Sequence, residues 1–350
     1  MHNFERYTNT YSVMAPGLAN ATTQTAPIMG DLDHQSQRAA LNNPSSGIRA
    51  SSLPPIEPAA GRLRRRLTAT AHWGGMVSTA PLVIQCAITG SVDPDPERRP
   101  NLPATPEAIV AEALAAWRAG AAVIHLHARQ ADGTPTQNRE AYRGLVAALD
   151  DAGCEAIVNL SCGSAGGRAV RDERLGPLEL SPEMASFDCG SINFREQLFE
   201  GDLPFLRQMA HRFREFGVRP EVECFDTGHV GLALQLRDEG LLNDPLVVQF
   251  VLGVPGSGVP ATVAMVEHLR AMIAPDWPWS VCAIGHAQLA LNTYCILAGG
   301  NVRTGLEDNL WFRRGERASN AALVERIVRI AGELDRPIAT PDEARAILGV

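Results

Sequence analysis

The sequence predicts a (β/α)₈ TIM barrel over residues 80–350, preceded by an N-terminal extension at residues 1–79. From residue 81 onward, eight strand-like segments alternate with helix-like segments, as this fold requires. Polar residues gather at the C-terminal ends of these strands, whereas the strand bodies are apolar. A doubly wound open sheet is the competing architecture, but the turn after the first strand, Thr89-Gly90-Ser91-Val92, lacks its G-x-G-x-x-G pattern.

The N-terminal extension differs in composition from the rest of the chain. It is rich in Ser, Thr, Asn, Pro and Ala and shows no sustained apolar periodicity, so we expect it to be disordered. No apolar stretch follows a basic start, which is against a secretory signal peptide. A targeting or interaction tail is one alternative, and a true start at Met76 is another.

The barrel elements follow from local patterns. Strands are short apolar, β-branched runs, expected at 81–89, 121–129, 155–160, 184–188, 219–225, 246–252, 279–283 and 300–303. Helices are expected at 106–119, 138–152, 203–216, 228–239, 260–273, 286–297 and 320–334. The first of them has Thr105 as N-cap and Pro106 at its first position.

Composition excludes several classes of partner. The chain carries 31 basic and 39 acidic residues, a net charge of −8, which is against nucleic-acid and anionic-membrane partners. No apolar run reaches the ~18 residues of a transmembrane helix. The seven cysteines are scattered and form no C-x-x-C pair, which is typical of reduced thiols in a cytoplasmic protein.

The sequence contains no lysine, because all 31 basic residues are arginine. This absence excludes a Schiff-base aldolase, an enzyme with an internal pyridoxal phosphate aldimine, and a P-loop. Any carbanion chemistry must be stabilised by another group, for which a metal ion is the obvious substitute.

The second strand ends in two histidines, His125 and His127. Successive side chains of a strand alternate, so these two imidazoles point the same way and form half of a zinc site. The H-x-H pattern is short, and two core histidines bonded to their neighbours are the alternative.

The segment after the eighth strand supplies the missing groups. Barrel closure places the eighth and second strands ~10 Å apart, on either side of the first, so Glu307 can reach the two histidines. Two histidines and one carboxylate form a common catalytic zinc set. Arg303 and Asp308 lie in the same segment, and their pairing would keep Asp308 ionised and aimed as a general base. A structural loop with an ion pair is the alternative.

Several long segments, in the correct order, resemble one family. They are AITGSV, PNLPATPEAIVAEALAAWRAGAAVIHLHAR, PEMASFDCGSINF, PEVECFD, VQFVLGVPG, GGNVRTGLEDN and RPIATPDEARAIL. Through them the sequence from about residue 82 resembles the β-keto acid cleavage enzymes, typified by 3-keto-5-aminohexanoate cleavage enzyme. The resemblance implies a (β/α)₈ barrel with one Zn²⁺, and a homotetramer.

The resemblance also implies roles for individual residues. His125, His127 and Glu307 match the zinc ligands, and Arg303 with Asp308 matches the catalytic dyad. Glu223 matches a second acidic catalytic position. The keto acid is expected to bind at Ser161, Ser164, Ser191 and Asn193.

Two positions depart from the family pattern. Ser164 replaces a glycine. Val92, followed by Asp93, stands where the aminohexanoate enzyme has a glutamate suited to a cationic substrate. The resemblance therefore implies a β-keto acid as substrate but does not identify it. The missing glutamate is against 3-keto-5-aminohexanoate itself.

The implied reaction joins a β-keto acid to acetyl-CoA and cleaves the product to acetoacetate and a new acyl-CoA. The glycine-rich loop at 253–258 precedes a helix and could bind a CoA phosphate, or could be a plain tight turn. Two other functions compete: a zinc-dependent hydrolase or lyase on the same fold, and a non-enzymatic metal-binding barrel. Amidohydrolases place H-x-H after the first strand and often use a carbamylated lysine, and neither feature occurs here.

Overall fold

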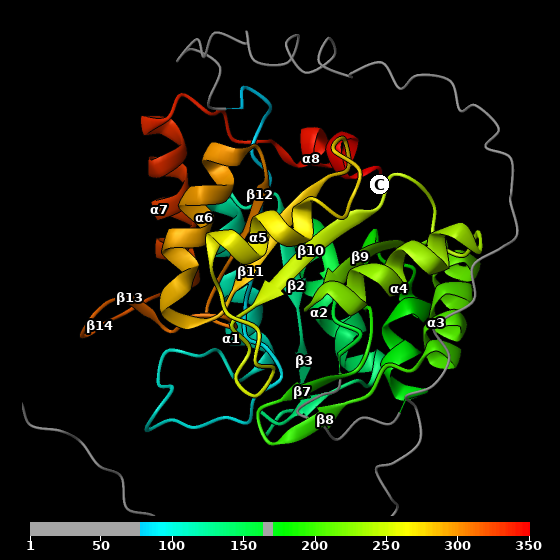
Figure 1. Cartoon of the computed structure of the whole chain (residues 1–350). Coiled ribbons are helices and arrows are strands. Elements are labelled where there is room, and N and C mark those ends of the chain that lie inside the picture. The colour runs from blue at the N-terminus through cyan, green and yellow to red at the C-terminus, as the bar shows by residue number, and fades with distance from the viewer. Residues whose placement is uncertain (1–77, 164–170) are drawn as a thin grey trace, which may run out of the picture. The chain divides into compact units, whose positions relative to one another are not determined.

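The computed structural model describes residues 78–163 and 171–350 (Figure 1). Eight parallel strands close into a barrel, because β1 pairs with β2 on one side and β12 on the other. These strands are β1 (Ile84–Ala87), β2 (Val123–Leu126), β5 (Ile157–Leu160), β6 (Met184–Asp188), β9 (Arg219–Cys224), β10 (Val247–Leu252), β11 (Trp279–Ala283) and β12 (Asn301–Thr304). The predicted (β/α)₈ fold is confirmed.

Of the described α-helices, six lie on the outside of the barrel between successive strands and two follow the last strand. They are α1 (Pro106–Arg118), α2 (Arg139–Asp151), α3 (Leu203–Phe216), α4 (Thr227–Asp238), α5 (Val263–Arg270), α6 (Gln288–Ala298), α7 (Asn320–Glu333) and α8 (Pro341–Leu348). Their ends follow from local chemistry. Thr105 caps α1 by accepting a hydrogen bond from the backbone N–H of Ala108, and α3 ends at Gly217, whose φ of 67° is left-handed.

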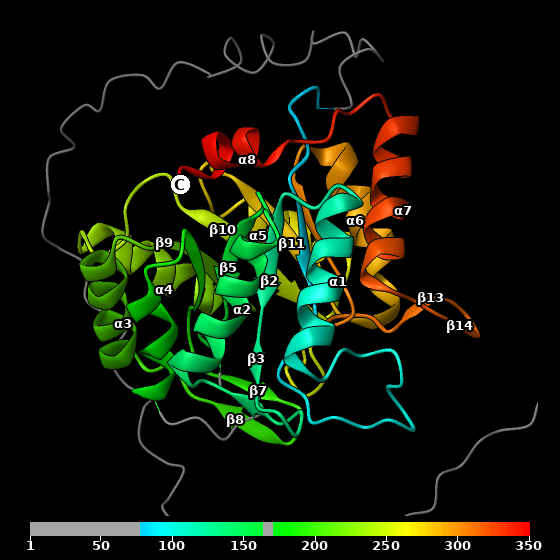
Figure 2. The ribbon, with the colours of Figure 1, turned by 180° about the vertical axis from the view of Figure 1, so that it is seen from behind.

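The N-terminal end of the barrel is closed by α8. Its buried Ala344 and Leu348 pack with residues at the start of several strands, among them Val123, Ile157 and Val247. Figures 1 and 2 show α8 at one end of the barrel and the β7–β8 hairpin, β7 (Ile192–Phe194) and β8 (Gln197–Phe199), at the other. The C-terminal ends of the strands are therefore the accessible end.

Several expected elements differ in detail. The strand expected at 121–129 ends at Leu126, after which β3 (Ala128–Arg129) turns away to pair with β4 (Pro135–Thr136). Helix α5 starts at Val263, later than expected, because Thr262 is its N-cap. The sequence analysis missed α8, a 3₁₀ helix at Glu173–Leu180, and three two-stranded sheets: β3–β4, β7–β8, and β13 (Trp311–Arg313) with β14 (Glu316–Arg317).

Some expectations fall on residues that the structure does not describe. The disordered extension at 1–79 lies outside the described residues except for its last two positions, and Ser164 also lies outside them. The domain boundary at residues 79 and 80 stays a prediction. Among the described helices, none combines the length and apolar character that a membrane crossing requires.

Candidate active site

A cavity of about 590 Å³ lies at the C-terminal end of the barrel. The predicted residues His125, His127, Arg303, Glu307 and Asp308 line it, as do Ser161 and Glu223. The structure thus brings together side chains from the second, third, fifth and eighth barrel strands and the loops that follow them. Its other walls include apolar residues such as Phe194, Phe225, Val254 and Ile284.

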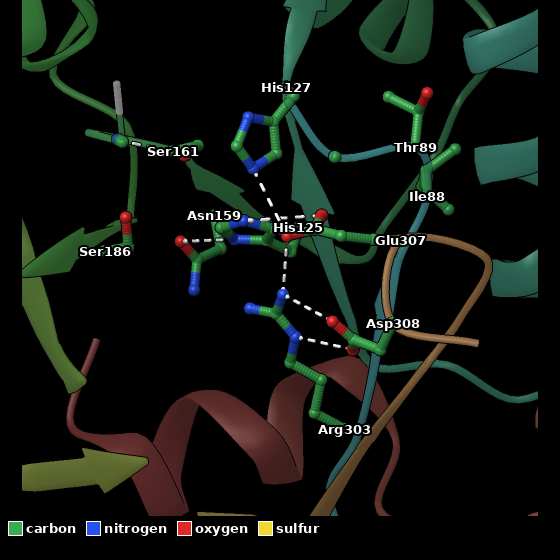
Figure 3. Close-up of polar contacts among 12 residues, drawn as sticks. Ile88, Thr89, His125, His127, Asn159, Ser161, Ser186, Arg303, Glu307 and Asp308 are labelled. Atoms are coloured by element: carbon green, nitrogen blue, oxygen red, sulfur yellow. Dashed lines mark hydrogen bonds and ion pairs between the residues drawn. The ribbon is translucent and has the colours of Figure 1, made fainter. Parts of the chain in front are cut away.

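Both histidines face the carboxylate of Glu307 (Figure 3). His127 Nε2 lies 3.3 Å from Glu307 Oε1, and His125 Nε2 lies 3.9 Å from Oε2. One potential ligand atom from each of the three residues lies within 4.8 Å of the others. Glu307 Oε2 is buried and has no hydrogen-bond partner in the described part of the chain, as a free metal-ligand position would.

The electrostatics of these three residues suit a metal ion. Burial, and after it the nearby Arg303, lower the pKa of His125 to about 3, so this imidazole is neutral at pH 7. Burial raises the pKa of Glu307, but His127 and Arg303 outweigh burial and hold it well below its usual range. A neutral imidazole and an ionised carboxylate are the forms that bind zinc.

Two glycines let Glu307 reach across β1 to the histidines. Gly305 has φ +133°, and a Cβ there would lie 2.1 Å from the carbonyl oxygen of Ala87. The backbone therefore passes close to β1, where the Glu307 N–H donates to Ala87 O at 3.2 Å. Gly90, with φ +70°, leaves room for the Glu307 side chain, since a Cβ there would lie 2.7 Å from Glu307 Cγ.

Arg303 is the buried cation of the site. Its Nε and Nη2 bind the two oxygens of Asp308 at 3.0 and 3.1 Å, and Nη2 also binds Glu307 Oε1 at 2.6 Å. Its Nη1 donates to Glu223 at 3.3 Å and to Gln249 at 3.2 Å. Burial lowers the pKa of Arg303, but the surrounding carboxylates, chiefly Asp308, outweigh burial and raise it well above its usual value.

Two carboxyl groups beside Arg303 have pKa values raised by burial. Burial raises the pKa of Asp308, and Arg303 only partly offsets it. The ion pair that the sequence predicts favours the charged form, whereas burial opposes it, so the structure shows a stronger base than expected. Burial and the neighbouring Asp188 raise the pKa of Glu223 well above its usual range, which favours its protonated form.

The predicted substrate-binding residues divide into two groups. Ser161 is buried and lines the cavity. Ser191 and Asn193 are exposed and are not among the described residues that line it. The Ser191 hydroxyl instead accepts the N–H of Gly201 at 2.9 Å. Their role in binding stays a prediction; the following residues of the same hairpin, 194–199, do line the cavity.

Among the cavity residues that were not predicted, two are polar residues of one barrel strand. Ser186 and Asp188 lie on β6, two positions apart, and both line the cavity. Residues two apart on a strand share a face, so the alternation in Ser186-Phe187-Asp188 was the available signal. Asp188 lies 3.7 Å from the guanidinium of Arg174, which packs over the rings of Phe199 and Phe205.

Arg129 and the glycine-rich loop at 253–258 both have structural roles. Arg129, which follows the H-x-H strand, donates to the carbonyl oxygens of Gly90 and Gly133, each at 2.8 Å, so it holds the loop after β1. In the loop at 253–258, Gly256 packs closely on the backbone of Arg195, whose N–H donates to Pro255 O at 2.5 Å. This contact supports the tight-turn interpretation.

Residues 81–350 match a family described as beta-keto acid cleavage enzyme. The chain belongs to this family. The 3-keto-5-aminohexanoate cleavage enzyme of Acetoanaerobium sticklandii is 42% identical over 271 residues, which cover 77% of this chain and 98% of the relative. The 3-dehydrocarnitine:acetyl-CoA trimethylamine transferase of Rhizobium meliloti is 34% identical over 284 residues, covering 75% of this chain and 94% of the relative.

Solved structures agree with the fold of this β-keto acid cleavage enzyme. A ternary complex of ObcA with a C4-CoA adduct and oxalate superposes with a TM-score of 0.63 at 24% identity, covering 72% of this chain and 68% of that one. The family assignment confirms the resemblance and shows a carbon–carbon bond-cleaving enzyme, which is against the non-enzymatic barrel and the hydrolase.

Proposed function

We propose that this enzyme is zinc-dependent and that it condenses a β-keto acid with acetyl-CoA, then cleaves the product to acetoacetate and a new acyl-CoA. The observation that carries the metal is the cluster of His125, His127 and Glu307, with its unpartnered buried carboxylate oxygen. The cluster offers two nitrogen ligands and one oxygen ligand, a set typical of catalytic zinc. A Lewis-acidic ion there supplies the electron sink that deprotonation of a keto acid requires, which no lysine of this chain can supply.

Acetyl-CoA as co-substrate is supported by the names of three relatives. They are called 3-dehydrocarnitine:acetyl-CoA trimethylamine transferase, 3-oxoadipate:acetyl-CoA acetyltransferase and 3,5-dioxohexanoate:acetyl-CoA acetone transferase. The keto acid differs between these names, whereas acetyl-CoA does not. We therefore treat acetyl-CoA as the shared co-substrate and the keto acid as the variable one.

In the proposed mechanism Asp308 is the base that removes a proton from C2 of the keto acid. Arg303 holds both oxygens of Asp308 and so fixes the direction of the carboxylate. The raised pKa of Asp308 makes it a stronger base than an exposed aspartate. Glu223 also lines the cavity and contacts Arg303 Nη1, and its raised pKa favours the protonated form, which can donate a hydrogen bond to a substrate oxygen.

The carbon skeleton then exchanges in two steps. The C2 carbanion attacks the thioester carbonyl of acetyl-CoA, a carbon–carbon bond forms, and the CoA thiolate leaves. The thiolate attacks the original C3 ketone, and the C2–C3 bond breaks to release a new acyl-CoA. The C2 of the resulting acetoacetate takes back the proton that Asp308 removed, so atoms and charge balance.

The keto acid is proposed to bind with its polar end at the cavity floor, near Ser161. Val92 and the apolar wall residues favour a substrate whose other end lacks the amino group of 3-keto-5-aminohexanoate, although Asp93 also lines the cavity. The resemblance further implies a homotetramer. The seven free cysteines, six of them buried, support a reducing compartment such as the cytoplasm.

The decisive experiment incubates the zinc-loaded enzyme with acetyl-CoA and a panel of β-keto acids. The expected result is release of acetoacetate and one new acyl-CoA in equal amounts, from one or a few members of the panel. The Asp308→Asn variant serves as the control, because it should bind zinc without turnover. Acetoacetate release that persists after complete zinc removal would refute the zinc dependence.

A further inference from the structure

Four polar side chains form a buried layer beneath the site, and the proposed mechanism does not use them. Gln85, Asn159, Glu221 and Gln249 come from four different barrel strands, and each is at most 4% exposed. Glu221 is the centre of this layer. Its Oε2 accepts from Gln85 Nε2 at 3.0 Å and Asn159 Nδ2 at 2.6 Å, and its Oε1 accepts from Gln249 Nε2 at 2.9 Å.

We propose that Glu221 is a positioning residue that sets both the zinc ligand His125 and the dyad residue Arg303, through Asn159 and Gln249. This inference rests on the proposed function. It assigns one buried carboxylate, without contact to substrate or metal, as the common anchor of the two halves of the site.

The first branch runs through Asn159 to the metal ligand. Both carboxylate oxygens of Glu221 act as acceptors here, so the end of Asn159 that faces Glu221 is its NH₂ group. The amide oxygen of Asn159 then faces His125 Nδ1 at 3.4 Å and accepts a hydrogen bond from its N–H. An imidazole with its proton on Nδ1 has a bare Nε2, which is the atom that faces Glu307.

The second branch runs through Gln249 to the dyad. Gln249 Nε2 donates to Glu221, so its amide oxygen points the other way and accepts from Arg303 Nη1 at 3.2 Å. A flipped amide would place an NH₂ group against the guanidinium and an oxygen against the carboxylate. Glu221 therefore fixes the one amide orientation that holds Arg303 in place beneath Asp308.

Substitutions that cut one branch at a time test the proposal. Asn159→Leu removes the metal branch and leaves Gln249 bonded to Glu221. Gln249→Met removes the dyad branch and leaves Asn159 in place. Outer-shell substitutions at metal and catalytic sites cost roughly 10–100-fold in affinity or activity. Ser280→Ala is the matched control, because Ser280 lies in the same layer and contacts only Gln249 of these residues, at 3.2 Å.

The readouts are Zn²⁺ affinity by chelator competition, the visible spectrum of the Co²⁺-loaded protein, and kcat for acetoacetate release. We expect Asn159→Leu to weaken Zn²⁺ binding by roughly 10–100-fold and to change the Co²⁺ spectrum. We expect Gln249→Met to lower kcat by a similar factor while Zn²⁺ affinity and the Co²⁺ spectrum stay those of the wild type. If these residues were merely structural, both substitutions would lower the melting temperature, but they would not separate a loss of Zn²⁺ affinity from a loss of kcat.

Glu221 itself is tested by the Glu221→Gln variant. The amide oxygen of the substituted side chain can still accept hydrogen bonds from Gln85 and Asn159, so its NH₂ group faces Gln249. We therefore expect this variant to lose turnover like Gln249→Met and to keep most of its Zn²⁺ affinity. Should it fail to fold, the two single-branch variants still decide the matter.

Two outcomes overturn the inference alone: wild-type Zn²⁺ affinity and Co²⁺ spectrum in Asn159→Leu, or wild-type kcat in both Gln249→Met and Glu221→Gln. If the wild-type protein binds Zn²⁺ and releases acetoacetate, and these variants behave like the wild type, only the inference fails. The proposed function is then unaffected. A wild-type protein that binds no Zn²⁺ overturns both proposals, because His125 is then not a ligand.

Discussion

The Gly90→Ala substitution is predicted to damage the metal site without touching a ligand. The new Cβ would lie 2.7 Å from Glu307 Cγ, against an ordinary carbon–carbon contact of about 3.5 Å, so Glu307 must retreat by ~0.8 Å. The loop cannot easily move instead, because the buried Arg129 binds the carbonyl oxygen of Gly90 at 2.8 Å. Zinc–ligand distances tolerate changes of only ~0.2 Å.

We expect this displacement to remove the contribution of Glu307 to Zn²⁺ binding. Zn²⁺ affinity should fall by roughly 100-fold, which corresponds to ~2.7 kcal/mol. Chelator competition at fixed pH measures this affinity. The substitution also forces alanine to adopt a φ of +70°, which costs ~1–2 kcal/mol of folding free energy and must be separated from the effect on the metal.

Gly315→Ala provides that separation. Gly315 lies at the turn of the β13–β14 hairpin with φ +78°, and a Cβ there meets no described atom within 4 Å. Both variants should lose a similar amount of stability in the metal-free state, whereas only Gly90→Ala should lose Zn²⁺ affinity. Equal Zn²⁺ affinity in the two variants would refute the steric reasoning.

Three further predictions follow from the same structure. Asp308→Asn should retain Zn²⁺ and lose turnover by roughly 10²–10⁴-fold, the usual contribution of a general base; near-normal acetoacetate release would remove Asp308 from the mechanism. Chelation of zinc should abolish turnover reversibly, and Zn²⁺ at ~100 times its Kd should restore ~2.7 kcal/mol of stability, measured by thermal unfolding; a melting temperature indifferent to zinc would contradict the site. Thr340→Ala should lower the free energy of unfolding by ~1 kcal/mol at unchanged kcat, because Thr340 and Glu343 form the capping box of α8; denaturant titration measures the loss, and an unchanged midpoint would show that the cap contributes nothing.

Much of the fold was predictable because it follows from local patterns. The expected bounds of β6, α3 and β11 agree with the structure, since each has a clear apolar period and distinct end signals. Helix α8 carried its own signal in Thr340-Pro341-Asp342-Glu343, a cap followed by proline and an acidic turn. It was missed because eight strand–helix units already account for a barrel, and nothing local requires a further helix to close its N-terminal end.

The residues of the candidate site also form two groups: those that could be predicted from the sequence and those that could not. Arg303, Glu307 and Asp308 lie within six consecutive residues, and His125 and His127 are two apart, so their pairing could be inferred from spacing and barrel closure. Asn159, Glu221 and Gln249 could not be found in this way. Asn159 and Gln249 are each the single polar residue of an apolar strand, and Glu221 alternates with Glu223 along β9, so only the closed barrel brings the three together.

The charge balance of the site gives an independent reason for a divalent cation. Arg303 contacts the carboxyl groups of Glu223, Glu307 and Asp308, so one buried cation faces three potential anions. Burial raises the pKa values of Glu223 and Asp308, and Arg303 only partly offsets this effect. Burying unpaired charges is costly, so a site built in this way requires more positive charge than Arg303 supplies. His125 and His127 beside Glu307 are ligands for an ion that would add positive charge to this site.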